Sequence, residues 1–425
     1  MDLAASPNAR PWYWIPTLYF GQGLPYVAVM CLSVVMYKNL QVSNTAIALY
    51  TSWLYLPWVI KPLWSPLVDL VGQKRAWIVG LQFVVGAALA LVALTVPAPL
   101  FFRLTLAMFW LMAFASATND IAADGFYLLA VPAGEQAAFV GVRSTAYRLA
   151  MIAGQGGLVY LAGTLTDLTG QPARAWAIVF WILAGLFLLF AVYHAWALPR
   201  PVADRPAPRG RASGFGREAL AVFAAFFRKP GIGTILAFLL LYRLGEAQLL
   251  KLAAPFLLDG REAGGLGLTT QQVGLYYGTV GVVALTLGGL AGGWAVSRLG
   301  LKRLLWPMIV AMHAPNLVYV ALAAARPGEA WVAGAAVAVE QLGYGFGFTA
   351  YLLYLMLVSE GEHRTAHYAI GTGFMALGMM LPGMGAGWLQ EQLGYPLFFA
   401  WACLATLPSV AVAARLRIPE AFGRK

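Results

Sequence analysis

Charged residues are scarce in this chain. Only 11% of its 425 residues are Asp, Glu, Lys or Arg, whereas an average soluble domain carries roughly 25%. So few charges exclude a water-soluble fold of this length. The chain also has only two cysteines, Cys31 and Cys403, both inside apolar segments, and four histidines. This scarcity excludes a disulfide framework and a Cys/His metal centre, so we expect no metal and no cofactor.

Long apolar stretches are abundant. Hydrophobic residues make up 61% of the chain, and its mean hydropathy is +0.72. A helix needs about 20 apolar residues to cross a bilayer, and twelve stretches fit that length: 12–36, 44–68, 76–96, 101–130, 140–165, 174–198, 231–258, 271–297, 304–325, 329–358, 365–390 and 395–416. We therefore predict an all-α membrane protein with twelve transmembrane helices. Residues 1–11 do not resemble a cleaved leader, so the first helix should stay in the mature protein.

The basic residues predict the orientation of these helices. The net charge is +11, which in a membrane protein reflects Lys and Arg retained in the cytoplasm rather than nucleic-acid binding. If the N-terminus is cytoplasmic, 19 basic residues fall in inner segments and five in outer ones. We therefore expect both termini in the cytoplasm, the lipid bilayer as surroundings and no nucleic acid as partner.

The segment 199–230 divides the chain. It is too polar and proline-rich to span a membrane, so we predict a cytoplasmic linker, with an interfacial helix in its second part. The linker separates an N-terminal half, 1–198, from a C-terminal half, 231–425. "DLVGQKR" (69–75) and "SRLGLKR" (297–303) follow the second helix of each half at a constant offset of 228 residues. Two parallel six-helix repeats are the architecture of the major facilitator superfamily.

Both repeated loops resemble that superfamily's signature between its second and third helices. The second loop has Ser297 where the first has an acid. The resemblance implies a gating role on the cytoplasmic side, and the alternative is ordinary topology-determining charge after a helix. The residues concerned are Asp69, Gly72, Lys74, Arg75, Arg298, Lys302 and Arg303.

Eight Asp, Glu, Lys and Arg residues lie more than four positions inside the predicted spans. They are Lys61, Arg148, Arg243 and Lys251, with Asp120, Asp124, Glu246 and Glu340. Such groups cost several kcal/mol at the bilayer centre unless they face protein or water, so each is a functional candidate. The alternative for Asp124, Arg148 and Lys61 is a structural ion-pair network. Lys251 lies near the outer end of its helix, where its amine is expected to reach water.

Asp120 and Asp124 lie four residues apart, on one face of a helix. At about 1.5 Å per residue, Asp120 is about 15 Å from the cytoplasmic end, near the bilayer midplane. Two neighbouring carboxylates in a low dielectric do not readily ionise together. We therefore expect one of them to carry a proton during function, with Asn119 beside it.

The C-terminal half offers a second set of polar residues. Arg243 precedes Glu246 by three residues, so the two form a local salt bridge or Arg243 holds an anionic solute. Glu340, about 16 Å from the outer end of its helix, is followed by Gln341 and Tyr344. In the first helix "GQGLPY" (21–26) places Gln22 and Tyr26 on one face of a kinked segment. We assign Glu246 and Glu340 to proton coupling and Gln22, Tyr26, Arg243, Gln341 and Tyr344 to solute binding.

Four ordered motifs resemble the AmpG branch of the superfamily. They are "GLP" (23–25), "KPLWSPLVD" (61–69), "SATNDIAAD" (116–124) and "YRLAM" (147–151). The resemblance implies proton-driven import of anhydro-muropeptides, which are cell-wall degradation products, across the bacterial inner membrane. It implies that Lys61, Asn119, Asp120, Asp124, Tyr147 and Arg148 are the polar site residues of the N-terminal half.

The chain departs from that branch directly after Asp124. The family pattern continues with Trp, a basic residue and an acid, whereas here "GFYLLAV" (125–131) follows, with Phe126 in the Trp place and no charge. The departure affects the assignment of the solute rather than that of transport.

The sequence therefore favours a proton-coupled secondary transporter working by alternating access. Its partners should be protons and an anionic small molecule, and we expect a monomer. The alternatives are a transporter of another organic anion (acyl-CoA-like, a peptide or a sugar acid), a membrane enzyme, or a signal transducer. An enzyme would need a nucleophile beside a base or a metal cluster, and no such pattern lies in the spans.

Overall fold

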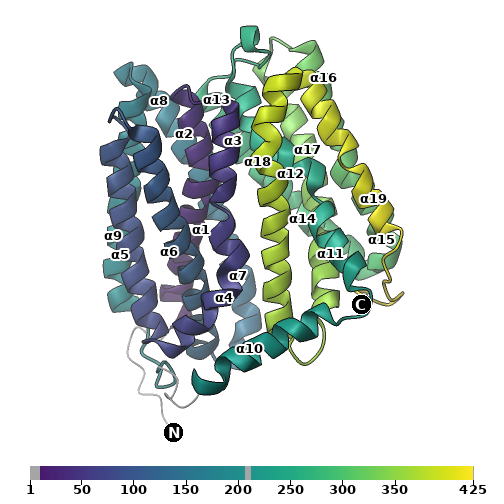
Figure 1. The fold of residues 1–425 in the computed structure, drawn as a ribbon. Coiled ribbons are helices and arrows are strands. Elements are labelled where there is room, and N and C mark those ends of the chain that lie inside the picture. Colours follow the sequence, from purple (N-terminus) through teal and green to yellow (C-terminus); the bar gives the residue numbers. More distant parts are fainter. Residues whose placement is uncertain (1–9, 206–211, 425) are drawn as a thin grey trace. The chain divides into compact units, whose positions relative to one another are not determined.

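The computed structural model describes residues 10–205 and 212–424, apart from the side chains of a few helical positions. Every regular element in these ranges is a helix (Figure 1). A segment inside a bilayer must satisfy its own backbone hydrogen bonds, so apolar runs of this length form helices. The described part of the chain thus confirms the predicted all-α class.

The observed helices follow the twelve expected spans closely. The first six spans correspond to η2 (Pro11–Tyr13), α1 (Ile15–Val27), η3 (Ala28–Leu32) and α2 (Ser33–Asn39); α3 (Asn44–Trp53) and α4 (Leu56–Leu70); α5 (Lys74–Thr95); α6 (Phe101–Ala130); α7 (Ala133–Met151), η4 (Ile152–Leu158) and α8 (Val159–Thr169); and α9 (Pro172–Ala197). The last six correspond to α11 (Ile232–Leu241) and α12 (Leu244–Leu258); α13 (Thr270–Val273), η7 (Gly274–Gly281) and α14 (Val282–Leu299); α15 (Leu301–His313), η8 (Ala314–Asn316) and α16 (Leu317–Ala325); α17 (Ala330–Ser359); and α18 (Arg364–Leu404) with α19 (Leu407–Ala413). The short helix η6 (Arg261–Ala263) lies between α12 and α13.

Length and composition give nine membrane-length helices among the described residues, or ten if a bent pair counts as one span. The bent pair joins Leu220–Phe227 to Ile232–Leu258. One of the nine runs for 50 residues, from Arg364 to Ala413, and contains two of the expected spans. Gly394, with φ of +71°, breaks the helical path there, because only glycine adopts this conformation without strain.

A helix forms within the linker, as expected. It is α10 (Ala212–Phe227), and the ring of Phe226 near its end stacks on Phe374 of α18. The side chain of Phe227 also contacts Phe374. The second part of the linker is therefore packed on the C-terminal helices.

The described helices fall into two compact units. Unit 1 comprises residues 1–33, 60–154 and 161–216, and unit 2 comprises residues 34–59, 155–160 and 217–425. Residues 34–59 come long before the linker in the sequence, but they pack with the helices that follow the linker. The division of the sequence into two six-helix halves stays a prediction.

Unit 1 is built around α1, α5, α6, α7 and α9. Helix α5 packs on α6 and α9, and α1 packs on α7. The close approach of α1 to α7 depends on Gly23, where a Cβ atom would come within 2.8 Å of the Cβ of Ala150. Small residues let membrane helices approach this closely, and dispersion contacts then hold them together.

Unit 2 contains two helices that organise the rest. Helix α17 packs on α14 and α15, and α18 packs on α12 and α3. Along α18, two glycines face α3. A Cβ atom at Gly387 would lie 2.0 Å from the backbone carbonyl oxygen of Asn44, and one at Gly383 would lie 2.7 Å from the side-chain Oγ of Ser52. Helix α3 therefore lies directly against α18.

Candidate functional site

Arg243, Glu246 and Tyr344 form a buried polar group in unit 2. Arg243 is the N-cap residue of α12, and Glu246 lies in its first turn. An Nη2 hydrogen of Arg243 is donated to Oε1 of Glu246 at 2.9 Å and another to the hydroxyl of Tyr344 at 2.6 Å. The Arg243 and Glu246 side chains are 8% and 1% exposed. The local salt bridge, one of the two expected arrangements, is therefore present.

Glu340 and Gln341 lie beside each other on α17. The amide of Gln341 donates to Oε2 of Glu340 at 2.9 Å, and Glu340 is 1% exposed. The other oxygen, Oε1, makes no hydrogen bond to any described residue. Helix α17 also contributes Val337, one turn away, to a large buried apolar cluster. Glu340 is thus a carboxyl group in mainly apolar surroundings, which strongly disfavours its charged form.

The polar residues expected in the N-terminal half lie in unit 1. Asp120 on α6 and Tyr26 on α1 both lie within electrostatic range of the Tyr147 hydroxyl on α7, so the structure brings these three together. Gln22 and Asn119 are buried, and each has an amide oxygen that no other described residue hydrogen-bonds. Buried polar atoms of this kind need water or a ligand as partner. Lys61 and Arg148 are half-buried.

Asp124 has a partner that the expected ion-pair network did not include. Its Oδ1 forms a salt bridge with Nη2 of Arg143 on α7. Arg143, one of the 19 basic residues assigned above to inner segments, lies well inside α7, which begins at Ala133. Arg143 precedes Tyr147 by four residues, so it shares a face of α7 with a predicted site residue. The four-residue spacing between Arg143 and Tyr147 could therefore have identified Arg143 from the sequence as a further candidate.

The first repeated loop is fixed within unit 1. Oδ1 and Oδ2 of Asp204, in the linker, accept hydrogen bonds from the backbone amides of Lys74 and Arg75 at 2.8 and 3.0 Å. These amides belong to the first two residues of helix α5. The Asp204 carboxylate therefore satisfies two of the backbone donors that have no partner within a helix at its N-terminus. The Arg75 side chain donates to the carbonyl of Leu198, after the end of α9.

The remaining residues of that loop have local roles. Gly72 has φ of +78°, which makes the turn before α5. The Lys74 side chain lies against Gly125 of α6, where a Cβ atom would be 2.5 Å from its Cε. The side chain of Asp69 lies outside the described residues, so its gating role stays a prediction.

The second repeated loop is held by the C-terminal tail. Lys302 donates to Glu420 at 2.9 Å, and the amide of Leu301 donates to the carbonyl of Phe422 at 3.0 Å. The tail thus supplies the acid that this loop lacks. Arg298 lies over the ring of Trp294 with its Cζ 5.8 Å from the centroid, and Arg303 is exposed.

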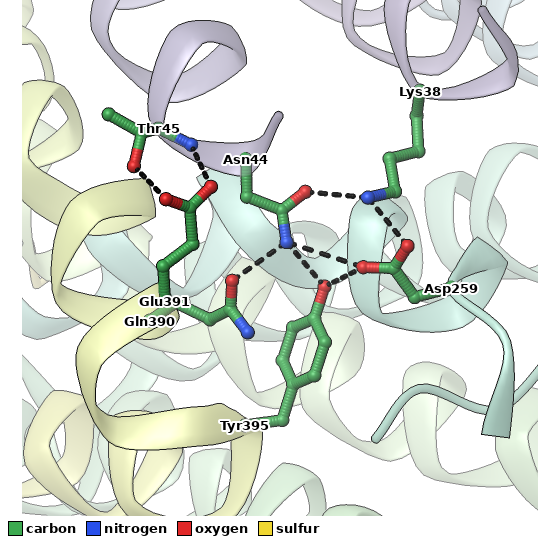
Figure 2. Close-up of polar contacts among 7 residues, drawn as sticks. All are labelled: Lys38, Asn44, Thr45, Asp259, Gln390, Glu391 and Tyr395. Atoms are coloured by element: carbon green, nitrogen blue, oxygen red, sulfur yellow. Dashed lines mark hydrogen bonds and ion pairs between the residues drawn. The ribbon is translucent and has the colours of Figure 1, made fainter. Parts of the chain in front are cut away.

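Seven polar residues meet at the opposite end of unit 2, which the charge bias predicts to be outer (Figure 2). We call them the outer polar cluster: Lys38, Asn44, Thr45, Asp259, Gln390, Glu391 and Tyr395. Lys38 forms a salt bridge of 2.5 Å with Asp259 and donates to Oδ1 of Asn44 at 2.9 Å. Tyr395 donates to Asp259 at 2.6 Å. The side chains of the ion pair are 14% and 15% exposed.

The amide of Asn44 is the centre of this cluster. Its Nδ2 donates to Gln390 at 2.7 Å, to Tyr395 at 2.9 Å and to Asp259 at 3.3 Å. Next to it, the amide and hydroxyl of Thr45 donate to Glu391 at 2.9 and 2.6 Å. The cluster therefore connects the ends of α2 and α3 to the end of α12 and to α18.

Sequence reasoning missed this cluster. Lys38 is one of the five basic residues assigned above to outer segments, and Asp259 and Tyr395 lie far from it in the sequence. The expectation that Lys251 reaches water is also wrong, because its side chain is buried, 8% exposed, and donates to Oγ1 of Thr51 at 3.0 Å. Helix α3 covers it, a packing that hydropathy cannot predict.

Membrane-length helices with buried polar groups in both units are the architecture of a multi-pass membrane protein. The chain belongs to the major facilitator superfamily, whose family model matches residues 17–381, so it is a membrane transporter rather than an enzyme.

Known proteins resemble this chain at modest identity. The anhydromuropeptide permease of Escherichia coli (strain K12) is 28% identical over 358 residues, which cover 83% of this chain and 69% of that protein. The putative transporter AmpG 4 of Rickettsia conorii is 24% identical, and the match covers 92% of each chain. The crystal structure of the D323A mutant of the nucleoside transporter NupG matches with a TM-score of 0.65 at 17% identity, covering 95% of this chain and 98% of that one. The last likeness concerns the fold alone.

Proposed function

We propose that this protein imports anhydro-muropeptides across the bacterial inner membrane, coupled to protons, by alternating access. The similarity to the anhydromuropeptide permease supports the solute. A muropeptide carries sugar hydroxyls that amides and tyrosines can bind, and carboxylates that pair with guanidinium or ammonium groups. The amides and tyrosines are supplied by Gln22, Tyr26, Asn119, Tyr147, Gln341 and Tyr344. The guanidinium and ammonium groups are supplied by Lys61, Arg148 and Arg243.

The buried carboxyl group of Glu340 is the observation that carries proton coupling. One of its oxygens has no hydrogen-bond partner among the described residues, and it is 1% exposed. A carboxyl group in this position is stable when protonated and costs several kcal/mol when charged. Loading and release of its proton therefore require that the surroundings change during transport. Asp120 is the corresponding candidate in unit 1, and Glu246 a further one in unit 2.

The outer polar cluster supports alternating access. Residues 34–59 belong to the N-terminal half by sequence, and the cluster joins them to α12 and α18. A solute entering from the outside would have to pass between the two halves, so we propose that the cluster closes that path and opens in the other state. Both termini and the linker are then cytoplasmic, in agreement with the charge bias.

The test is uptake of labelled anhydro-muropeptide by proteoliposomes that contain the purified protein, with and without an inward proton gradient. We expect saturable uptake that the gradient stimulates. Asp120→Asn and Glu340→Gln should abolish accumulation against a gradient and spare exchange, while Arg243→Ala should raise the apparent KM for anionic solutes. Uptake that ignores the gradient would refute the coupling.

Another organic anion is the alternative solute. The segment "GFYLLAV" after Asp124 lacks the charges of the AmpG pattern, and this specific observation favours the alternative. The alternative would be supported if the folded protein transports no anhydro-muropeptide but exchanges a peptide, a sugar acid or an acyl-CoA.

A further inference from the structure

Arg143 has unusual surroundings for a residue that nothing above assigns to transport. Its Cζ lies 4.2 Å from the ring centroid of Tyr19 on α1 and 4.2 Å from that of Tyr127 on α6. The two rings are nearly perpendicular, at 86°, with centroids 6.2 Å apart. The guanidinium therefore lies in a corner formed by two aromatic rings, where cation–π attraction from both fixes its plane.

The same guanidinium binds Asp124. Nη2 of Arg143 pairs with Oδ1 of Asp124, and the hydroxyl of Tyr19 donates to that oxygen at 3.2 Å. We call Tyr19, Asp124, Tyr127 and Arg143 the Asp124 cluster. Its members come from α1, α6 and α7, and all lie in unit 1. A charge-assisted bond and a hydroxyl bond on one oxygen orient this carboxylate, whose side chain is 51% exposed.

The cluster places a positive charge where helix α6 itself has none. Tyr127 follows Asp124 by three residues, on the same face of the helix. Arg143 of the next helix lies over the Tyr127 ring and supplies the positive charge beside Asp124. A lysine at position 127 would bring its amine close to the place of the Arg143 guanidinium.

We propose that Arg143 is a positioning residue for transport, which fixes Asp124 and connects α1, α6 and α7 around it. It supplies from α7 a positive charge that α6 does not itself place beside Asp124. Asp124 is then part of the scaffold of unit 1, and Asp120, one turn away beside Asn119, is the carboxyl group of α6 that exchanges a proton. The inference deepens the proposed function and rests on it.

The central test is a rescue experiment. Uptake of labelled anhydro-muropeptide into proteoliposomes is compared for the wild type, Arg143→Ala, Tyr127→Lys combined with Arg143→Ala, and Arg103→Ala. The last variant removes an exposed arginine at the other end of α6 and is the matched control. We expect Arg143→Ala to lower the maximal rate at least tenfold with KM changed less than threefold, and the double variant to recover to within about threefold of the wild type.

A milder variant tests the cluster without removing a charge. Tyr19→Phe keeps the ring and deletes only the hydroxyl bond to Asp124, so it should fold even if Arg143→Ala does not. This bond is longer than an optimal one, at 3.2 Å, and the Asp124 side chain is 51% exposed, so its loss should lower the maximal rate only roughly three- to tenfold. Unchanged rates in Tyr19→Phe and Arg143→Ala, or a loss in Arg143→Ala that the lysine at position 127 does not restore, would overturn the proposal.

A second readout needs no solute. Backbone hydrogen exchange of the α6 segment around Asp124 should accelerate in Arg143→Ala and return toward the wild-type rate in the double variant. Failure of the wild type to take up anhydro-muropeptide would remove the proposed solute and leave this readout intact. Exchange that is the same in all three proteins would remove the inference about Arg143 instead.

Discussion

Replacing Tyr395 by phenylalanine should weaken the outer polar cluster while leaving its packing in place. The substitution deletes a hydroxyl that donates to Asp259 at 2.6 Å and accepts from Asn44 at 2.9 Å. The aromatic ring, which lies 4.9 Å from that of Phe256, remains. Asn44 keeps its bond to Gln390 at 2.7 Å, so no donor of the cluster is left wholly without a partner.

The expected effect follows from the charge of Asp259. A hydrogen bond to a charged group contributes about 1.5–3 kcal/mol, and about 1.4 kcal/mol corresponds to a factor of ten in an equilibrium constant. The ratio of outer-closed to outer-open protein should therefore fall roughly ten- to 100-fold.

Cysteine labelling measures this ratio. Ala48, on α3 and one turn below Asn44, is 0% exposed, so a cysteine there reacts only when the outer end opens. In a background with Cys31 and Cys403 replaced by alanine, an impermeant maleimide added from outside should label Ala48→Cys faster by the same factor. The labelling rate of Ala48→Cys has an upper limit, which is the rate in protein that is fully open to the outside.

Tyr276→Phe is the matched control. It removes a tyrosine hydroxyl from the same unit, and its ring packs on Gly334 of α17. We expect its labelling rate to equal that of the parent. Equal rates in Tyr395→Phe and Tyr276→Phe would refute the view that the cluster holds the outer end closed.

Three further predictions concern other parts of the fold. Glu246→Gln should leave the buried guanidinium of Arg243 without its counter-ion and lower the free energy of unfolding by about 3–5 kcal/mol. A thermal unfolding scan measures the effect as a lower unfolding temperature. An unchanged unfolding temperature would show that the salt bridge is dispensable. Gly387→Val should disrupt the packing of α3 on α18, because even a Cβ atom would lie 2.0 Å from a backbone carbonyl of α3. Maleimide labelling of Ala48→Cys should therefore become fast. A labelling rate equal to that of the parent would contradict the close approach of the two helices. The hydrogen bond and charge of Lys302 hold the pKa of Glu420 below its ordinary value of 4.5. Since the folded-state pKa is the lower one, the contact stabilises the tail above the unfolded-state pKa and is lost as the pH falls through the folded-state value. Proteolysis of the tail with an acid-active protease should therefore accelerate below about pH 4.5 in the wild type, and Glu420→Gln should remove that dependence; identical pH profiles would exclude the pair as the cause.

The site residues divide according to the kind of signal that their sequence carries. Arg243 and Glu246 are three residues apart, so local spacing offered their salt bridge as one of two arrangements, and the structure shows that it is formed. Asp120 and Asp124 were likewise predicted to share a face of one helix. Local spacing could not predict that Asp124 pairs with Arg143, because this depends on how α7 is rotated against α6.

The sequence by itself determined the membrane class, the all-helical fold and the approximate ends of the helices, because a bilayer imposes a length and an apolar composition on every segment that crosses it. It also identified most of the ionisable groups that lie inside the helices, with Arg143 of α7 as an exception. Only the tertiary structure decided their partners: Arg143 for Asp124, Glu420 for Lys302, and Thr51 for Lys251. The physical reason is that apolar composition fixes only that a helix is in the membrane, whereas partners depend on helix rotation and on close approach at glycines.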